Sequence, residues 1–89
     1  MRAVITVIGK DTTGIIAQVS DILWKNGVNV MDITQSILSD LFVMVMLTDI
    51  SKSKVDFPAL REQVTALGDE LGLKIHVMHE DVFNSMHRI

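Results

Sequence analysis

The sequence predicts an α+β domain in which strands and helices follow one another in the order βαββαβ, with a short helix at the C-terminal end. Two observations carry this prediction. The first is four segments rich in apolar and β-branched residues, with the alternation or short continuous run that is typical of strands. They span residues 2–9, 28–38, 41–47 and 73–79. The second is two longer segments, after the first and third strands, whose apolar residues recur at helical spacing.

The first strand and the first helix are joined by a short polar loop. Residues 2–9 are apolar on both faces except for Thr6, so we expect a central strand in the sheet. A helix over residues 14–26 follows, and its apolar stripe predicts the face that packs on the core. That stripe consists of Ile15, Val19, Ile22 and Leu23. Asn26-Gly27 ends the helix, because both residues tolerate the left-handed conformation of a helix cap.

The second and third strands form a predicted hairpin with Ser39-Asp40 as its turn. Apolar and polar side chains alternate over residues 28–38, so we expect this strand to be half exposed. Its apolar face holds Met31, Ile33 and Ile37 with Gln35 among them, and its polar face holds Asp32, Thr34 and Ser36. Residues 41–47 are apolar on both faces, which predicts an internal strand. Because helices cover one face of a two-layer domain, we expect a second subunit to cover the other face.

The second helix is predicted from its start signal, its stripe and its stop signal. Asp56 is the expected N-cap, and Pro58 stands in the first turn, where a missing amide costs little. The apolar stripe consists of Phe57, Leu60, Val64, Leu67 and Leu71. Gly72 ends the helix, and Gly68 inside it costs about 1 kcal/mol relative to alanine.

The last strand, over residues 73–79, leads into a short helix that Glu80-Asp81 begins and His87-Arg88 ends. The complete order is the ferredoxin-like, split βαβ pattern, a four-stranded antiparallel sheet with two helices on one face. We therefore expect residues 1–89 to form one domain, with residues 80–89 as a C-terminal helical extension. Many unrelated activities share this fold, so the fold alone does not define the function.

Composition narrows the class of protein. The chain has 89 residues, of which 48% are hydrophobic, and part of this apolar surface is expected at a subunit interface. There is no cysteine, and the net charge of −3 with a pI near 5.4 argues against a nucleic-acid partner. We see neither a signal peptide nor a stretch of transmembrane length. We expect a cytoplasmic homodimer that needs no cofactor and contacts neither nucleic acid nor membrane.

Three groups of side chains allow either a functional or a structural interpretation. His76, His79, Glu80 and His87 resemble metal ligands, but His76 and His79 differ by an odd number and point to opposite faces of a strand. We therefore expect solvent-exposed histidines, and the sequence leaves metal binding open. Trp24 is either a contact anchor or, more commonly for such a position, the edge of the core. The methionines are expected to fill gaps in core and interface. They are Met31, Met44, Met46, Met78 and Met86.

Several activities of the ferredoxin-like fold are disfavoured by residues that the sequence lacks. A phosphate-binding P-loop needs a lysine after its second glycine, whereas Lys10 follows the first. Metal chaperones need a Cys-x-x-Cys loop, and RNA-recognition domains need aromatics on the central strands, where only Phe42 stands. The first loop also lacks an arginine that would hold phosphate, and no spacing indicates a catalytic triad or a paired-carboxylate site.

The stretch Val4–Ile16, V-I-T-V-I-G-K-D-T-T-G-I-I, joins a strand to a helix start. The first amides of a helix lack intrahelical partners and attract anions, and Gly14 lets a ligand approach the backbone. Such a loop suits a zwitterion. The alternative is a plain turn in which Asp11, Thr12 or Thr13 caps the helix, and caps are commoner than sites.

The same stretch, continued by A-Q-V-S and later by N-G-V-N-V-M-D-I-T-Q, resembles the ACT domain, a small-molecule-sensing regulatory module. The hallmark is Asp-x-x-Gly, here Asp11 and Gly14, followed by an amphipathic helix and Gly-Val-Asn-Val, here Gly27 to Val30. The resemblance covers the whole chain and is closest to short stand-alone bacterial and archaeal ACT proteins.

The resemblance implies a homodimer with amino-acid ligands at its interface. Asp11 then takes the ligand's ammonium, the amides at Gly14-Ile15 take its carboxylate, and Asn29 reaches the ligand from the partner subunit. The family often has proline where Thr13 stands, so this loop is expected to be less stiff. The implied ligand-binding residues are Asp11, Thr12, Thr13, Gly14, Ile15, Asn29 and Val30.

The leading hypothesis is therefore a non-catalytic regulatory domain that senses an amino acid and acts on a separate enzyme or regulator. The second hypothesis is a structural interaction module without a ligand. The third, a small enzyme, is disfavoured because the sequence shows no evident nucleophile or metal-ligand set.

Overall fold

The structure, a computed structural model, describes residues 1–10 and 12–86. Its elements confirm the predicted order βαββαβ with a C-terminal helix. They are β1 (Arg2–Lys10), α1 (Ile15–Lys25), β2 (Asn29–Leu38), β3 (Leu41–Asp49), α2 (Phe57–Leu71), β4 (Lys74–His79) and α3 (Glu80–Met86). Each predicted element exists, and its ends differ from the predicted ones by at most two residues within the described part of the chain.

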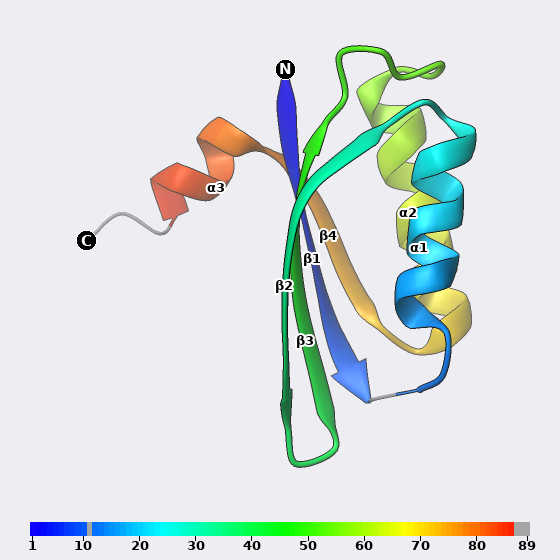
Figure 1. Ribbon diagram of the computed structural model, residues 1–89, viewed down its shortest axis with the longest axis vertical. Coiled ribbons are helices and arrows are strands. Elements are labelled where there is room, and N and C mark those ends of the chain that lie inside the picture. The colour runs from blue at the N-terminus through cyan, green and yellow to red at the C-terminus, as the bar shows by residue number, and fades with distance from the viewer. Residues whose placement is uncertain (11, 87–89) are drawn as a thin grey trace.

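The four strands form one antiparallel sheet in the order β2-β3-β1-β4. The predicted internal positions of the first and third strands are therefore confirmed. Figure 1 shows α1 and α2 side by side on one face of the sheet, and α3 on the opposite side. We call the face under α1 and α2 the helix face, and the opposite face the outer face.

The core lies between the helix face and the two long helices. The alternation of β1 places Ala3, Ile5 and Val7 on the helix face, where all three are buried. Their neighbours on β3, Met44 and Met46, are fully buried as well, as expected of core methionines. The helices contribute the predicted stripe residues Ile15, Val19, Leu23, Leu60 and Val64. Burial of this single apolar layer stabilises the fold.

The ends of α2 follow the predicted signals. The Asp56 carboxylate accepts a hydrogen bond from the Ala59 amide at 2.9 Å, and Gly72 adopts the left-handed conformation with φ 73°. Gly68 is buried where β4 passes close to the helix, and an added Cβ would lie 2.8 Å from Ile75 Cγ1. This close approach explains why a poor helix former stands inside the helix.

The end of α1 differs from the prediction in one detail. Asn26 is not left-handed, with φ −93°, and only Gly27 takes the left-handed conformation, with φ 75°. Asn26 is instead a buried C-cap whose side-chain amide donates to Ile22 O at 2.9 Å and to Gln63 Oε1 at 2.8 Å. These bonds tie the end of α1 to α2.

The predicted half-exposed second strand is wrong in its burial. The register places Ile33 and Ile37 beside Met46 and Phe42 of the helix face, as expected. Met31, which was predicted on the same face, instead stands at a β-bulge between Val30 and Asp32, where the register shifts by one residue. Every residue of β2 from Met31 onward is nevertheless exposed, including Ile37 at 56%. The physical reason is the strand order: β2 is an edge strand, and the two helices do not extend over its apolar side chains.

The outer face is apolar along its two central strands. It presents Val4, Thr6 and Ile8 from β1, Val43, Val45 and Leu47 from β3, and Lys74, His76 and Met78 from β4. The helix α3 packs on β1 and β4 at one end of this face, and Val4, on the same face of β1, is buried. The chain's own C-terminal helix therefore covers part of the face for which we expected only a second subunit.

Candidate functional site

The loop between β1 and α1 ends in a left-handed glycine. Gly14 is the N-cap of α1, with φ 84° and ψ 12°, and is exposed to solvent. The first intrahelical bond runs from the Gln18 amide to Gly14 O at 3.0 Å, so the preceding amides have no acceptor within the helix. A cluster of free amide donors at the positive end of a helix dipole binds anions such as carboxylates.

The side-chain cap expected as the alternative is not formed by the described residues of this loop. Thr12 and Thr13 are exposed and make no capping bond to α1, while Asp11 lies outside the described residues. Among the described residues, a Cβ added to Gly14 would meet only Gln18 Nε2, at 3.5 Å. No other described residue fills the space above this backbone, and Ile15, buried in the core, anchors the helix start beneath it.

The second half of the predicted site lies at the other end of the sheet. Asn29 begins β2 and is exposed, and Val30 beside it is half-buried against the core. In the register, Asn29 is level with the start of β1, whereas Lys10, at the end of β1, is level with Leu38. Eight strand residues at about 3.3 Å each separate the two ends by roughly 26 Å. A single chain thus does not bring Gly14 and Asn29 together.

Three cavities of the described chain lie away from these residues. The largest, about 980 Å³, is an open groove between α2 and β4 that includes Arg61, Asp69 and His76. A second surrounds the start of α3, and the smallest, about 160 Å³, lies near Phe57. Neither Gly14 nor Asn29 contributes to any of them.

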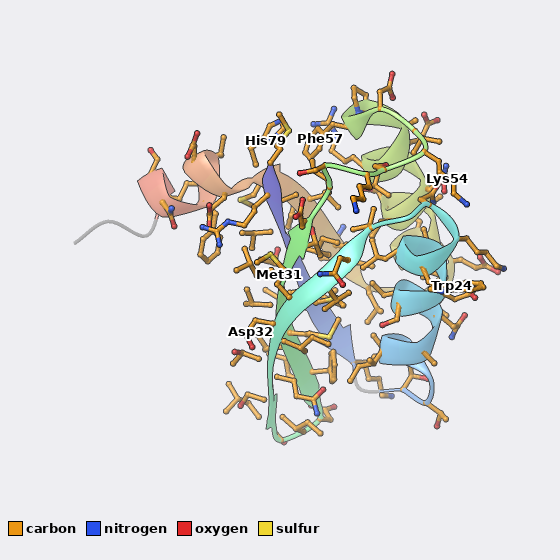
Figure 2. The ribbon with its side chains drawn as sticks, turned by 45° about the horizontal axis from the view of Figure 1, so that its top comes forward. Trp24, Met31, Asp32, Lys54, Phe57 and His79 are labelled. Carbon is orange, nitrogen blue, oxygen red and sulfur yellow. The ribbon has the colours of Figure 1, made fainter. Side chains whose placement is uncertain are left out.

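His76 and His79 do not form a shared site. His76 is exposed on the outer face, as expected, but His79 is not: its ring stacks on Phe57, with ring centroids 4.0 Å apart. Figure 2 shows these two side chains next to each other. Within residues 1–10 and 12–86, no three His, Asp or Glu side chains come close enough to hold a metal ion. His87 lies outside the described residues.

The stack of Phe57 and His79 was not found from the sequence. The Arg61 guanidinium lies 5.5 Å from the centre of the Phe57 ring and extends the cluster. The predicted topology could have revealed this contact, because α2 begins at the end of the sheet where β4 stops. The first residue of α2 and the last residue of β4 therefore meet there. The position of Trp24 was also wrong, because it is 76% exposed on α1 instead of lying at the edge of the core.

Among the described residues, no helix combines the length and the apolar character needed to cross a membrane.

Similar proteins match this chain over nearly its whole length. A UPF0237 protein of Clostridium perfringens is 53% identical over 89 residues and covers all of both chains. A UPF0237 protein of Methanocaldococcus jannaschii is 50% identical over 88 residues, covering 99% of this chain and 98% of the other. The solved structure of an ACT domain protein from Streptococcus pneumoniae superposes with a TM-score of 0.80 at 40% identity and covers 93% of both chains.

A further solved structure, of a putative glycine cleavage system transcriptional repressor, is 26% identical with a TM-score of 0.73. This chain is covered to 85% and spans 43% of that longer protein. The family model of the ACT domain matches residues 2–78, which include both halves of the motif and the elements of the βαββαβ order up to the last residue but one of β4. The chain belongs to the ACT domain family.

Proposed function

We propose that this chain is a non-catalytic regulatory domain that forms a homodimer and binds an amino acid at the subunit interface. The observation that carries the proposal is the exposed, left-handed Gly14 at the start of α1, where no described residue caps the first amides by its side chain. A ligand carboxylate would accept hydrogen bonds from these amides, and the Asp11 carboxylate would take the ligand's ammonium.

The position of Asn29 supports a site shared between two subunits. The β2 edge is long and exposed over its whole length from Met31, and edge strands of this kind pair readily with a second chain. A two-fold axis that sets two β2 edges antiparallel places the Asn29 end of one strand beside the Leu38 end of the other. The loop around Gly14 lies at this Leu38 end, so the partner's side-chain amide would approach the ligand there.

The regulatory role is supported by the family. ACT domains are small and typically bind regulatory ligands, and the structural neighbour named as a putative transcriptional repressor combines such a fold with further sequence. We propose that this chain catalyses no reaction and acts on a separate enzyme or regulator. Ligand binding would stabilise the homodimer. The regulated enzyme or regulator would then recognise the ligand-bound dimer.

The test is a thermal-shift and calorimetric screen of the full chain against the twenty amino acids. One amino acid, bound with a stoichiometry of one per subunit, is the expected result. If no amino acid binds to a stable dimer, a structural interaction module without a ligand would be favoured instead. The three cavities described above also favour that alternative, because none of them includes Gly14. A monomer at micromolar concentration would contradict both.

A further inference from the structure

We propose that the groove between α2 and β4 binds an extended segment of another protein as a fifth strand of the sheet. The segment carries an acidic, an apolar and a basic side chain at alternate positions, all facing α2. Only the identity of its owner, the regulated enzyme or regulator, rests on the proposed function, because the groove includes none of the residues of the ligand site.

The groove follows an unpaired edge of the sheet. The strand β4 is last in the strand order, and within the described chain it pairs only with β1. The groove, about 980 Å³, is lined by every residue from Leu73 to Met78 and by one flank of α2. An edge strand presents a row of backbone N–H and C=O groups without partners, and an extended peptide can pair with them.

At this edge α2 lies over the strand itself. Ile75 and Val77, on the helix face of β4, are both only 5% exposed although their strand is at the edge. Gly68 allows this close approach, since an added Cβ would lie 2.8 Å from Ile75 Cγ1. The other edge strand lacks such cover, because Ile33 and Ile37 of β2 are exposed. A strand added beside β4 therefore places alternate side chains against the flank of a helix.

This position of α2 determines which occupant fits the groove. Paired strands lie about 4.8 Å apart, so a second copy that paired its β4 with this one would bring its α2 within about 5 Å of the first. Packed helices need about 8–10 Å between their axes. The occupant is therefore an extended segment that carries no helix above it, and a second copy of this chain does not fit.

The flank of α2 presents charges of opposite sign at its two ends. Arg61, Thr65 and Asp69 recur every four residues, so they form one row along the groove. Neither charged side chain forms an ion pair with another described residue. Arg61 lies over Phe57, whose ring stacks on His79, so this end of the row is at the end of β4. The Asp69 end of the row is at the start of β4.

The other charged residues of the groove point away from this row. Glu62 lies about 160° around the helix from the buried Val64, so its side chain points to solvent. Lys74 and His76 belong to the outer face of β4, on the opposite side of an added strand. The row therefore selects a segment with an acidic side chain opposite Arg61 and a basic side chain opposite Asp69.

The spacing of the row sets the spacing in the segment. Arg61 and Asp69 are eight helix residues apart, or about 12 Å at 1.5 Å per residue. On one face of a strand, side chains recur about every 6.7 Å, so four residues span about 13 Å. The acidic and basic residues are thus four positions apart, and an apolar side chain between them faces the half-buried Thr65. Antiparallel pairing, as in the rest of this sheet, places the acidic residue first.

The test is calorimetric titration of the full chain with a seven-residue probe peptide. In this peptide threonines alternate with glutamate, valine and lysine in that order, and a second peptide exchanges the glutamate and the lysine. We expect saturable binding of the first peptide, at least tenfold tighter than binding of the second. The double variant Arg61→Glu with Asp69→Lys should reverse this preference. Glu70→Lys reverses a charge at the next residue, outside the groove, and should bind both peptides as the wild type does. All three positions are exposed, and circular dichroism verifies folding.

Hydrogen exchange separates strand addition from a purely electrostatic contact. At saturation with the first peptide, the backbone amides of β4 that point away from β1 should exchange more slowly by about tenfold or more. No saturable binding, binding that ignores the order of the charges, or unprotected β4 amides would overturn the inference. A fall in the sedimented mass on addition of the peptide would also overturn it, because a second copy would then occupy this edge. The amino-acid screen is run without peptide, so the proposed function and this inference can fail separately.

Discussion

Replacing Gly14 by alanine separates the backbone role of this residue from its role in binding. Because Gly14 is left-handed, alanine pays about 1–2 kcal/mol of backbone strain there. Alanine also lowers the conformational entropy of the unfolded chain, which stabilises the folded state by about 0.4–1 kcal/mol. Among the described residues, the added Cβ meets only Gln18 Nε2, at an ordinary contact distance of 3.5 Å, so no steric cost is added. The net loss is about 1 kcal/mol, or roughly 4–8 °C in Tm for a domain of this size.

The chain contains a matched control for this strain. Gly72 has nearly the same backbone conformation, with φ 73° and ψ 26°, and an added Cβ there meets nothing within 4 Å. Gly72→Ala should therefore lower Tm by a similar amount. Only Gly14→Ala should also weaken amino-acid binding, by at least tenfold or about 1.4 kcal/mol, because its Cβ occupies the space where the carboxylate meets the amides.

The assay pairs thermal melting without ligand, at one fixed protein concentration, with calorimetric titration of the amino acid that the screen identifies. Gly14→Asn is a second variant, since asparagine tolerates the left-handed conformation: it should retain more stability than the alanine variant and still lose affinity. If Gly14→Ala melts like Gly72→Ala but binds the ligand as tightly as wild type, the ligand does not sit at this loop. A neutral or higher Tm for Gly14→Ala would refute the argument from strain.

Three other variants test separate parts of the structure. Asn29→Ala should weaken ligand binding by about 1–3 kcal/mol in calorimetry, as expected for a lost hydrogen bond to a charged group, with little change in Tm because the side chain is exposed. Gly27→Ala should lower the free energy of unfolding in urea by more than 2 kcal/mol, about twice the loss at Gly14, because strain at φ 75° adds to a Cβ contact of 2.8 Å with Lys52 O. Ser51→Ala should raise the pKa of Asp49, measured by NMR titration, because the Ser51 hydroxyl and amide donate to this carboxylate and hold its pKa below the ordinary 3.8. Since the folded-state pKa is lowered, these contacts stabilise the wild type above pH 3.8, and this stabilisation is lost as the pH falls through the folded-state value. The variant keeps the bond from the residue 51 amide, so this pH dependence should become smaller.

The elements of this fold could be predicted because their signals are local. The carboxylate of Asp56 and the backbone of Gly72 act within one turn of the helix that they delimit, so their effect depends on few distant residues. The alternation along β1 likewise reports which side chains meet the helices. Such signals remain valid whatever the order of the strands in the sheet.

The burial of β2 could not be predicted in the same way, because it depends on strand order. Alternation assigned Ile33 and Ile37 to the helix face correctly, but coverage depends on how far α1 and α2 extend across the sheet. The predicted burial of Trp24 was wrong for a related reason. Its place on α1 follows from helical spacing, whereas its exposure depends on which neighbour lies beside that helix. In both cases the prediction placed an apolar side chain in the core or at its edge, whereas the structure has it exposed.

The geometry of the candidate site is even harder to predict from local sequence signals, because its two halves lie at different ends of the sheet. Gly14 and Asn29 stand fifteen positions apart in sequence, joined by one helix, yet β1 and β2 carry them to opposite ends, roughly 26 Å apart. A motif with this property acts as one site only across a symmetric contact between two chains. Ligand binding and subunit association are then thermodynamically linked, because a ligand that needs both subunits stabilises the dimer by its own binding free energy. Under the proposed function, the concentration of a small molecule would set the population of this dimer, and regulation would require no chemistry from the chain itself.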